Sequence, residues 1–141
     1  MEKGIRISAA SRKIMESLAD TMIPSEGPER PGAADMDAVN RLLDFFSQIP
    51  PVAFRAFIFS CWMWEFSPLW IGKIRRFTSL ALEDRVRTLE SFENSRLMFR
   101  RWALLILKAV IMASFYNNPK IWPFIGYQEG CLSNPPKPLE D

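Results

Sequence analysis

The chain contains no histidine among its 141 residues. This absence excludes Ser-His-Asp and Cys-His nucleophiles, a haem His ligand and His-rich metal sites. The two cysteines, Cys61 and Cys131, lie far apart and give no zinc or iron–sulfur spacing. The six glycines are scattered, so no phosphate-cradling loop is present. We therefore expect no catalytic residue, no metal site and no cofactor site in this chain.

Long apolar runs are also missing. Residues 52–72 are apolar and aromatic but include Arg55, Glu65 and Pro68, and residues 102–116 are too short and carry Lys108. A membrane-spanning helix needs about 20 mostly apolar residues. We expect no transmembrane segment, and a helix lying in the plane of a membrane surface remains the alternative.

Basic and acidic residues nearly balance over the chain as a whole, and the net charge is only +2. It is uneven, however: residues 73–108 carry nine basic and four acidic side chains. The arginines fall on alternate sides of helices that also have an apolar seam. This distribution favours a solvated or partner-facing basic surface, and we expect no nucleic-acid partner.

Apolar periodicity predicts an all-α protein with no strands. Residues 1–127 should form a single compact domain of about five helices, and the Pro-rich residues 128–141 should form an extended tail. The five helices are expected to run from Ser8 or Ser11 to Ile23, from near Asp35 to Phe46, from Val52 to Phe66, from Leu82 to Glu93, and from near Ser95 to Phe115. A short aromatic turn should follow between Pro119 and Gly126.

Carboxylate pairs occur twice, as Asp35/Asp37 and Glu83/Asp84. Each pair lies where a helix is expected to begin. Acidic side chains at such positions cap the helix and complement its dipole, so we interpret them as structural rather than catalytic.

The helix expected over residues 52–66 has almost no polar face. One stripe contains Phe54, Phe57, Ile58, Cys61 and Trp62, and another contains Phe59, Met63 and Phe66. Such a helix must be covered nearly all round. Two explanations stay open: a partner protein covers it, or it is a core helix surrounded by the other four.

Residues 115–127 carry the densest set of aromatic side chains. Flat, rigid side chains just outside a long helix are typical of a surface that holds a large partner. Trp122 could instead fold back on the preceding helix. The residues expected to bind a partner are Trp62, Trp64, Trp70, Trp122, Phe124 and Tyr127.

An ordered series of short motifs resembles the gluconate 2-dehydrogenase subunit 3 family over about residues 14–127. The motifs are Leu18-Ala19-Asp20-Thr21-Met22-Ile23-Pro24, Gly27-Pro28, Pro31-Gly32-Ala33, Phe77 with Leu80 before Glu83-Asp84-Arg85, Phe115-Tyr116, Asn118-Pro119, Trp122 and Ile125-Gly126-Tyr127. A similar pattern occurs ahead of the flavin domain in long-chain alcohol oxidases.

This resemblance implies a non-catalytic small subunit that binds and stabilises a large FAD-dependent dehydrogenase of the glucose–methanol–choline type. The large subunit would hold FAD and oxidise a sugar or another alcohol, with a cytochrome or other electron-transfer subunit as a further partner. Many family members carry a twin-arginine signal, which the opening residues Met1–Arg6 lack. We therefore expect a cytoplasmic complex, with a periplasmic complex as the alternative.

Two other readings remain. The chain could be a free-standing helical module that binds a membrane surface or an apolar ligand. An enzyme without a cofactor would need a polar cluster in a cleft, and the sequence shows none.

Overall fold

The computed structural model describes residues 5–127, which form six α-helices, two 3₁₀-helices and no strand. The predicted all-α class is confirmed. The expected tail, residues 128–141 with Cys131, lies outside the described residues. The elements are α1 (Ala9–Met22), α2 (Ala38–Ser47), α3 (Pro51–Glu65), η1 (Ser67–Ile71), η2 (Phe77–Ser79), α4 (Leu82–Glu93), α5 (Met98–Tyr116) and α6 (Trp122–Ile125).

Several helix ends follow the sequence signals. Ser8 is the N-cap of α1, and its Oγ accepts a hydrogen bond from the Ser11 N–H at 3.1 Å. Pro51 occupies the first turn of α3, where its missing N–H costs nothing. The bounds of α4 are as predicted, with Glu83 and Asp84 in its first turn.

The second helix begins later than expected, at Ala38 rather than near Asp35. Asp35 closes a turn instead, because its carboxylate accepts a hydrogen bond from the Gly32 N–H at 2.8 Å. Hydrogen bonds from the Ser25 side chain and from Gly32 lower the pKa of Asp35. Asp37 has φ of 54° and makes no capping bond, although its carboxylate accepts from the Asn40 amide.

The fifth helix also begins late, at Met98 rather than near Ser95. The Ser95 Oγ accepts a hydrogen bond from the Leu97 N–H at 3.2 Å, which ties the turn before the helix. The helix ends at Tyr116, one residue beyond the predicted end. The serine therefore shapes the approach to α5 and does not cap it.

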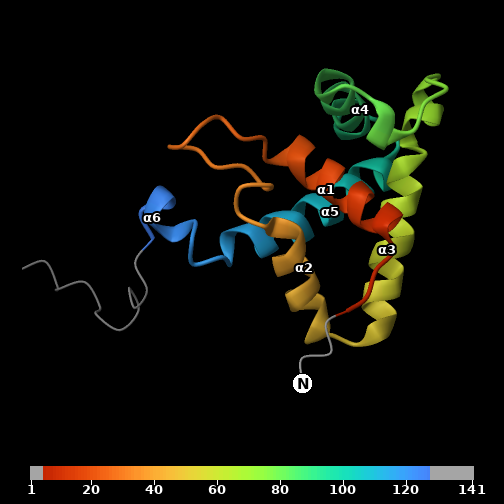
Figure 1. Ribbon diagram of the computed structural model, residues 1–141. Coiled ribbons are helices and arrows are strands. Elements are labelled where there is room, and N and C mark those ends of the chain that lie inside the picture. The colour runs from red at the N-terminus through yellow and green to blue at the C-terminus, as the bar shows by residue number, and fades with distance from the viewer. Residues whose placement is uncertain (1–4, 128–141) are drawn as a thin grey trace, which may run out of the picture.

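The core lies where α1, α2, α3 and α5 meet. The most extensive packing of any two elements is between α2 and α5, followed by α1 on α3 and α4 on α5. Figure 1 shows α3 along one side of the molecule and α6 at the opposite side. Among the most deeply buried core side chains are Ile14, Met15, Leu18, Leu42, Phe46, Cys61, Phe77, Leu104, Leu107 and Ile111.

Buried polar side chains connect distant segments. The Asn118 side-chain amide donates to the Met36 carbonyl at 2.8 Å, which links the end of α5 to the segment before α2. Glu65, the last residue of α3, is buried and accepts hydrogen bonds from the Thr78 N–H at 3.1 Å and hydroxyl at 2.6 Å. These bonds hold η2 against the end of α3 and satisfy a buried carboxylate.

Candidate partner-binding surface

The outward half of α5 is mostly apolar. Its large exposed side chains include Met98, Phe99, Trp102, Leu105 and Ile106, and the alanines of the same helix, Ala103, Ala109 and Ala113, are exposed too. We call the five large residues the α5 apolar face. The opposite side of the helix packs into the core through Leu104, Leu107, Ile111 and Phe115. A helix that is apolar on both sides normally has both sides covered.

The third helix shows the same imbalance. Phe57, Cys61 and Trp64 are buried, whereas Val52, Phe59, Met63 and Phe66 are exposed. Within residues 5–127 the other helices therefore cover α3 on one side only. Of the two explanations that the sequence left open, complete enclosure by the other described helices does not hold.

A groove runs between α3 and α5 and has a volume of about 260 Å³. Trp64 and Phe92 are buried in it, with ring centroids 4.8 Å apart. We call it the α3–α5 groove. Its lining residues are Phe59, Ser60, Met63, Trp64, Ser67, Trp70, Phe92, Phe99, Arg100 and Ala103.

Arg100 is the one charged residue that lines this groove. Its guanidinium carbon lies 5.4 Å from the ring centroid of Trp70 and 5.3 Å from that of Phe92. Trp70 and Phe92 are themselves stacked, with centroids 5.9 Å apart. The aromatic rings therefore hold a cation at the apolar surface through cation–π contacts.

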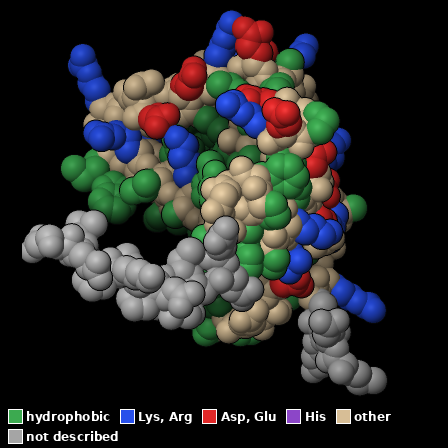
Figure 2. All heavy atoms as spheres, turned by 90° about the vertical axis from the view of Figure 1, so that its left-hand side faces the viewer, with side chains coloured by type: hydrophobic (Ala, Val, Ile, Leu, Met, Phe, Trp, Pro, Cys, Tyr) green, Lys and Arg blue, Asp and Glu red, His purple; other side chains and the backbone are tan. Residues whose placement is uncertain are grey.

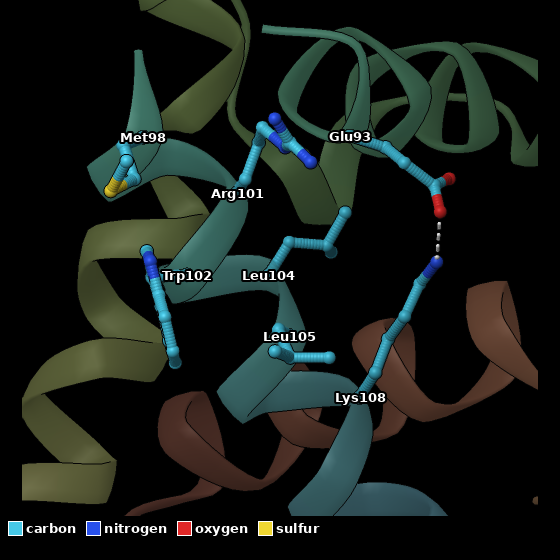
Figure 3. Close-up of a pocket in the computed structure, with 7 residues that line it drawn as sticks. All are labelled: Glu93, Met98, Arg101, Trp102, Leu104, Leu105 and Lys108. Atoms are coloured by element: carbon cyan, nitrogen blue, oxygen red, sulfur yellow. Dashed lines mark hydrogen bonds and ion pairs between the residues drawn. The ribbon is translucent and has the colours of Figure 1, made fainter.

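A second pocket, of about 390 Å³, lies on the α4 side of α5. Figure 3 shows Met98 and Trp102 on one side of α5 and Lys108 reaching across to Glu93 of α4. The Lys108 ammonium and the Glu93 carboxylate are 3.0 Å apart. The remaining lining residues are Arg101, Leu104 and Leu105. The α5 apolar face therefore lies between the α3–α5 groove and this second pocket.

Basic side chains lie beside the apolar ones. Arg96, Arg100 and Arg101 fall within the first turns of α5 or just before it, and none forms an ion pair with a carboxylate in the described part of the chain. Figure 2 shows hydrophobic side chains at the surface close to Lys and Arg side chains. The surface at the start of α5 is therefore both apolar and positively charged.

The six predicted partner-binding residues do not form one patch. Trp64 and Trp70 both line the α3–α5 groove, where Trp64 is buried and Trp70 is exposed. Trp62 lies elsewhere on α3, half-buried, and its indole N–H donates to the Ser11 Oγ at 3.2 Å.

The other three predicted residues lie in or beside α6, and none of them lines the α3–α5 groove. The Trp122 indole N–H donates to the Tyr116 carbonyl at 3.1 Å, so this side chain lies back on the end of α5. Trp122 and Tyr127 meet edge to face with centroids 5.0 Å apart. Phe124 and Tyr127 are each about half exposed. Gly126, at φ of 69°, ends the short helix.

Sequence reasoning did not assign Phe99 or Arg100 to a binding surface, and it considered Phe59 only as part of a helix that a partner or the other helices would cover. A projection of residues 98–116 at 100° per residue would have found the signal, because half of the circumference contains no charged residue. The stacking of Arg100 on Trp70 and Phe92 joins three elements and has no signal in the local pattern.

The chemistry of the described residues is limited. Burial raises the pKa of the Cys61 thiol to about 12, so it stays protonated near neutral pH and behaves as a small apolar side chain. In residues 5–127 no three Asp, Glu or Cys side chains gather in the way that a metal ion would require. None of the helices described here combines the length and the apolar character that crossing a membrane would take.

Comparisons of this chain with known proteins find no matching family model, no matching curated protein and no matching solved structure. The resemblance noted in the sequence stays a prediction.

Proposed function

We propose that this chain is a non-catalytic subunit that binds and stabilises a larger protein through the α3–α5 groove and the α5 apolar face. The observation that carries the proposal is the outward half of α5, where Trp102 is 57% exposed and its large neighbours are exposed to a similar degree. Contiguous apolar surface of this kind marks protein–protein or membrane contact sites. Aromatic residues, Met and Arg are also the types enriched at interfaces.

The partner that we propose is a large FAD-dependent dehydrogenase of the glucose–methanol–choline type that oxidises a sugar or another alcohol. The support is the resemblance to the gluconate 2-dehydrogenase subunit 3 family together with the absence of histidine from this chain. In this proposal FAD is held by the partner, and this chain supplies no catalytic group. A cytochrome or other electron-transfer subunit would bind the assembled complex.

Co-expression with a tagged flavoprotein of this type, encoded beside this chain, tests the proposal. The chain should co-purify with the tag and the complex should show the visible absorption of bound flavin. Leu105→Glu places a charge on the α5 apolar face and should weaken association about tenfold or more. Leu82→Glu is the matched control, because Leu82 is equally half-exposed but lies in the first turn of α4, where a carboxylate suits the helix dipole.

Two results would contradict the proposal. Equal association of the Leu105→Glu and Leu82→Glu chains would remove α5 from the interface. Failure of the unaltered chain to bind the flavoprotein would exclude this partner, even if the α5 apolar face binds another protein.

A membrane surface is the second candidate, favoured by the arginines beside the α5 apolar face. It predicts that the chain alone sediments with vesicles of phosphatidylcholine and phosphatidylglycerol, and that about 0.5 M salt releases it. A chain that stays in the supernatant under low salt eliminates this candidate.

A further inference from the structure

Two buried polar atoms in the lining of the α3–α5 groove have no hydrogen-bond partner among the described residues. They are the Oγ of Ser67, a residue that is only 2% exposed, and the Nε of Arg100. A buried donor or acceptor that is left unpaired has lost its hydrogen bonds to water without replacing them, which is unfavourable. Native proteins rarely keep such atoms without a reason, and a binding site that is completed by its ligand is one such reason.

The position of Arg100 makes this pair of atoms informative. Its guanidinium is stacked against Trp70 and Phe92, which limits its rotamers and holds its N–H donors at the groove. A guanidinium presents a planar fork of donors that matches a carboxylate. No carboxylate of residues 5–127 pairs with it. The groove therefore contains an oriented cation that lacks an anion.

Apart from these atoms the groove is apolar. Phe59, Met63 and Phe99 form its exposed edges, and its volume of about 260 Å³ lies below the roughly 300–1,000 Å³ of typical small-molecule sites. A space of this size suits one large side chain. The groove also opens onto the wider α5 apolar face, as expected of a site for an anchor within a protein interface.

We propose that the α3–α5 groove receives one large apolar side chain from a partner protein, with a carboxylate of the same segment beside it. The apolar group contacts Trp64 and Phe92, and the carboxylate accepts hydrogen bonds from Arg100. Arg96 and Arg101 add positive charge around an acidic segment. This inference rests on the proposed function for the existence of a protein partner, but not on that partner being a flavoprotein.

The chemistry can be tested on the isolated chain carrying Leu105→Glu, a change outside the groove lining that weakens self-association through the α5 apolar face. The probes are 3-phenylpropionate and 3-phenylpropionamide, which differ only in the carboxylate. Titration of ¹⁵N-labelled protein at about pH 7 keeps the acid ionised. Both probes should shift the amide signals of Ser60, Met63 and Phe99. The carboxylate should bind about tenfold more tightly than the amide.

Variants then assign the selectivity. Arg100→Gln should remove the preference for the carboxylate, while Arg101→Gln, which changes the neighbouring arginine at the other pocket, should keep it. Ala103→Trp fills the groove from an exposed helical position and should abolish binding of both probes. Preserved helix content by circular dichroism shows that each variant still folds.

Each remaining outcome overturns the inference. Equal binding of the acid and the amide would show that no carboxylate is recognised. Shifts of amide signals outside the groove, without shifts of Ser60, Met63 and Phe99, would show that the probes bind at another place. If the groove signals shift with vesicles containing phosphatidylglycerol and with neither probe, the occupant is a membrane surface.

Comparison with the co-expression experiment separates the two proposals. A flavoprotein complex that survives both Arg100→Gln and Ala103→Trp keeps the proposed partner and the α5 apolar face as its binding site, but removes the α3–α5 groove from the interface and overturns this inference. Selective binding of the carboxylate without any flavoprotein complex keeps this inference and overturns the proposed partner.

Discussion

Helices α2 and α5 pack on one another, yet they differ in how they use their apolar side chains. In α2 the apolar residues Val39, Leu42, Leu43 and Phe46 are all buried, and the one large exception is Phe45. In α5 more apolar side chains are exposed than buried. Packing within the chain therefore covers nearly all apolar side chains of α2. The α5 side exposes apolar surface that a soluble monomer would normally cover. The contrast indicates where a partner belongs.

The strongest test of this contrast makes the same substitution on both sides. Phe46 is 5% exposed, and its ring centroid lies 4.9 Å from that of Phe57, so Phe46→Ala should lower the free energy of unfolding by about 3–5 kcal/mol. Phe99 is 58% exposed, so Phe99→Ala should change it by less than about 1 kcal/mol. Urea unfolding followed by circular dichroism measures both. If Phe99→Ala lowered the free energy of unfolding as much as Phe46→Ala, the two sides of the molecule would not differ in the way described.

The α6 segment gives an intermediate case. Trp122 packs against the core and donates to the Tyr116 carbonyl, so Trp122→Ala should destabilise the chain by about 2 kcal/mol. Tyr127→Ala should cost less than about 1 kcal/mol, because half of Tyr127 is exposed. The same unfolding experiment compares them.

Complex formation adds a second readout for this pair. If Tyr127 is an anchor on the partner, its alanine variant should weaken the complex while the chain keeps its fold. Unchanged affinity in both variants would leave α6 out of the interface.

Self-association is the next expected effect. Because its α5 apolar face is uncovered, the chain expressed without a partner should associate with itself or aggregate. Leu105→Glu should weaken this association about tenfold at equal concentration, and Leu82→Glu should leave it unchanged. Analytical ultracentrifugation measures the change. A monomer of the unaltered chain with a sharp thermal transition would support the free-standing module instead.

The smallest effect concerns an ion pair at the surface. A hydrogen bond from Lys73 lowers the pKa of Asp84 in the folded chain. The pair therefore stabilises the fold above the pKa that this carboxyl has when unfolded, and the contribution disappears as the pH falls through the folded pKa. Asp84→Asn should flatten the loss of stability as the pH falls below about 5.

The size of that effect should depend on salt, because both side chains are more than a third exposed. Urea midpoints over this pH range, at low salt and at about 1 M salt, provide the measurement. A slope that is the same in Asp84→Asn and in the unaltered chain would show that the pair contributes nothing.

The sequence predicted the helical class and most helix positions because the signals are local. Pro24, Pro51 and the acidic first turn of α4 act within a few residues of themselves. The start of α2 was predicted wrongly because a local signal at Asp35 was assigned to the wrong structure. The Asp35 carboxylate bonds to Gly32 behind it rather than to a helical N–H ahead of it, and a list of capping residues does not distinguish the two.

The candidate surface was harder to predict. Periodicity separates α5 into a stripe with Met98, Trp102 and Leu105 and a stripe with Leu104, Lys108 and Ile111, and both stripes are mostly apolar. Which one faces inward depends on how α2 and α4 lie, and this is tertiary information. The unpartnered atoms of Ser67 and Arg100 depend on the same packing, so the α3–α5 groove could not be predicted from the sequence.

The contact between α2 and α5 also has a consequence for synthesis. The ribosome finishes α2 some fifty residues before it begins α5, and the bond between Met36 and Asn118 closes only after Asn118 has been made. Until then the buried face of α2 has no partner from α5, and nascent chains with uncovered apolar faces are prone to aggregate. At about 5–20 residues per second this interval lasts several seconds. Folding of this protein should therefore depend on chaperones that hold the nascent chain, and a stop codon just before Met98, which removes α5, should yield insoluble protein.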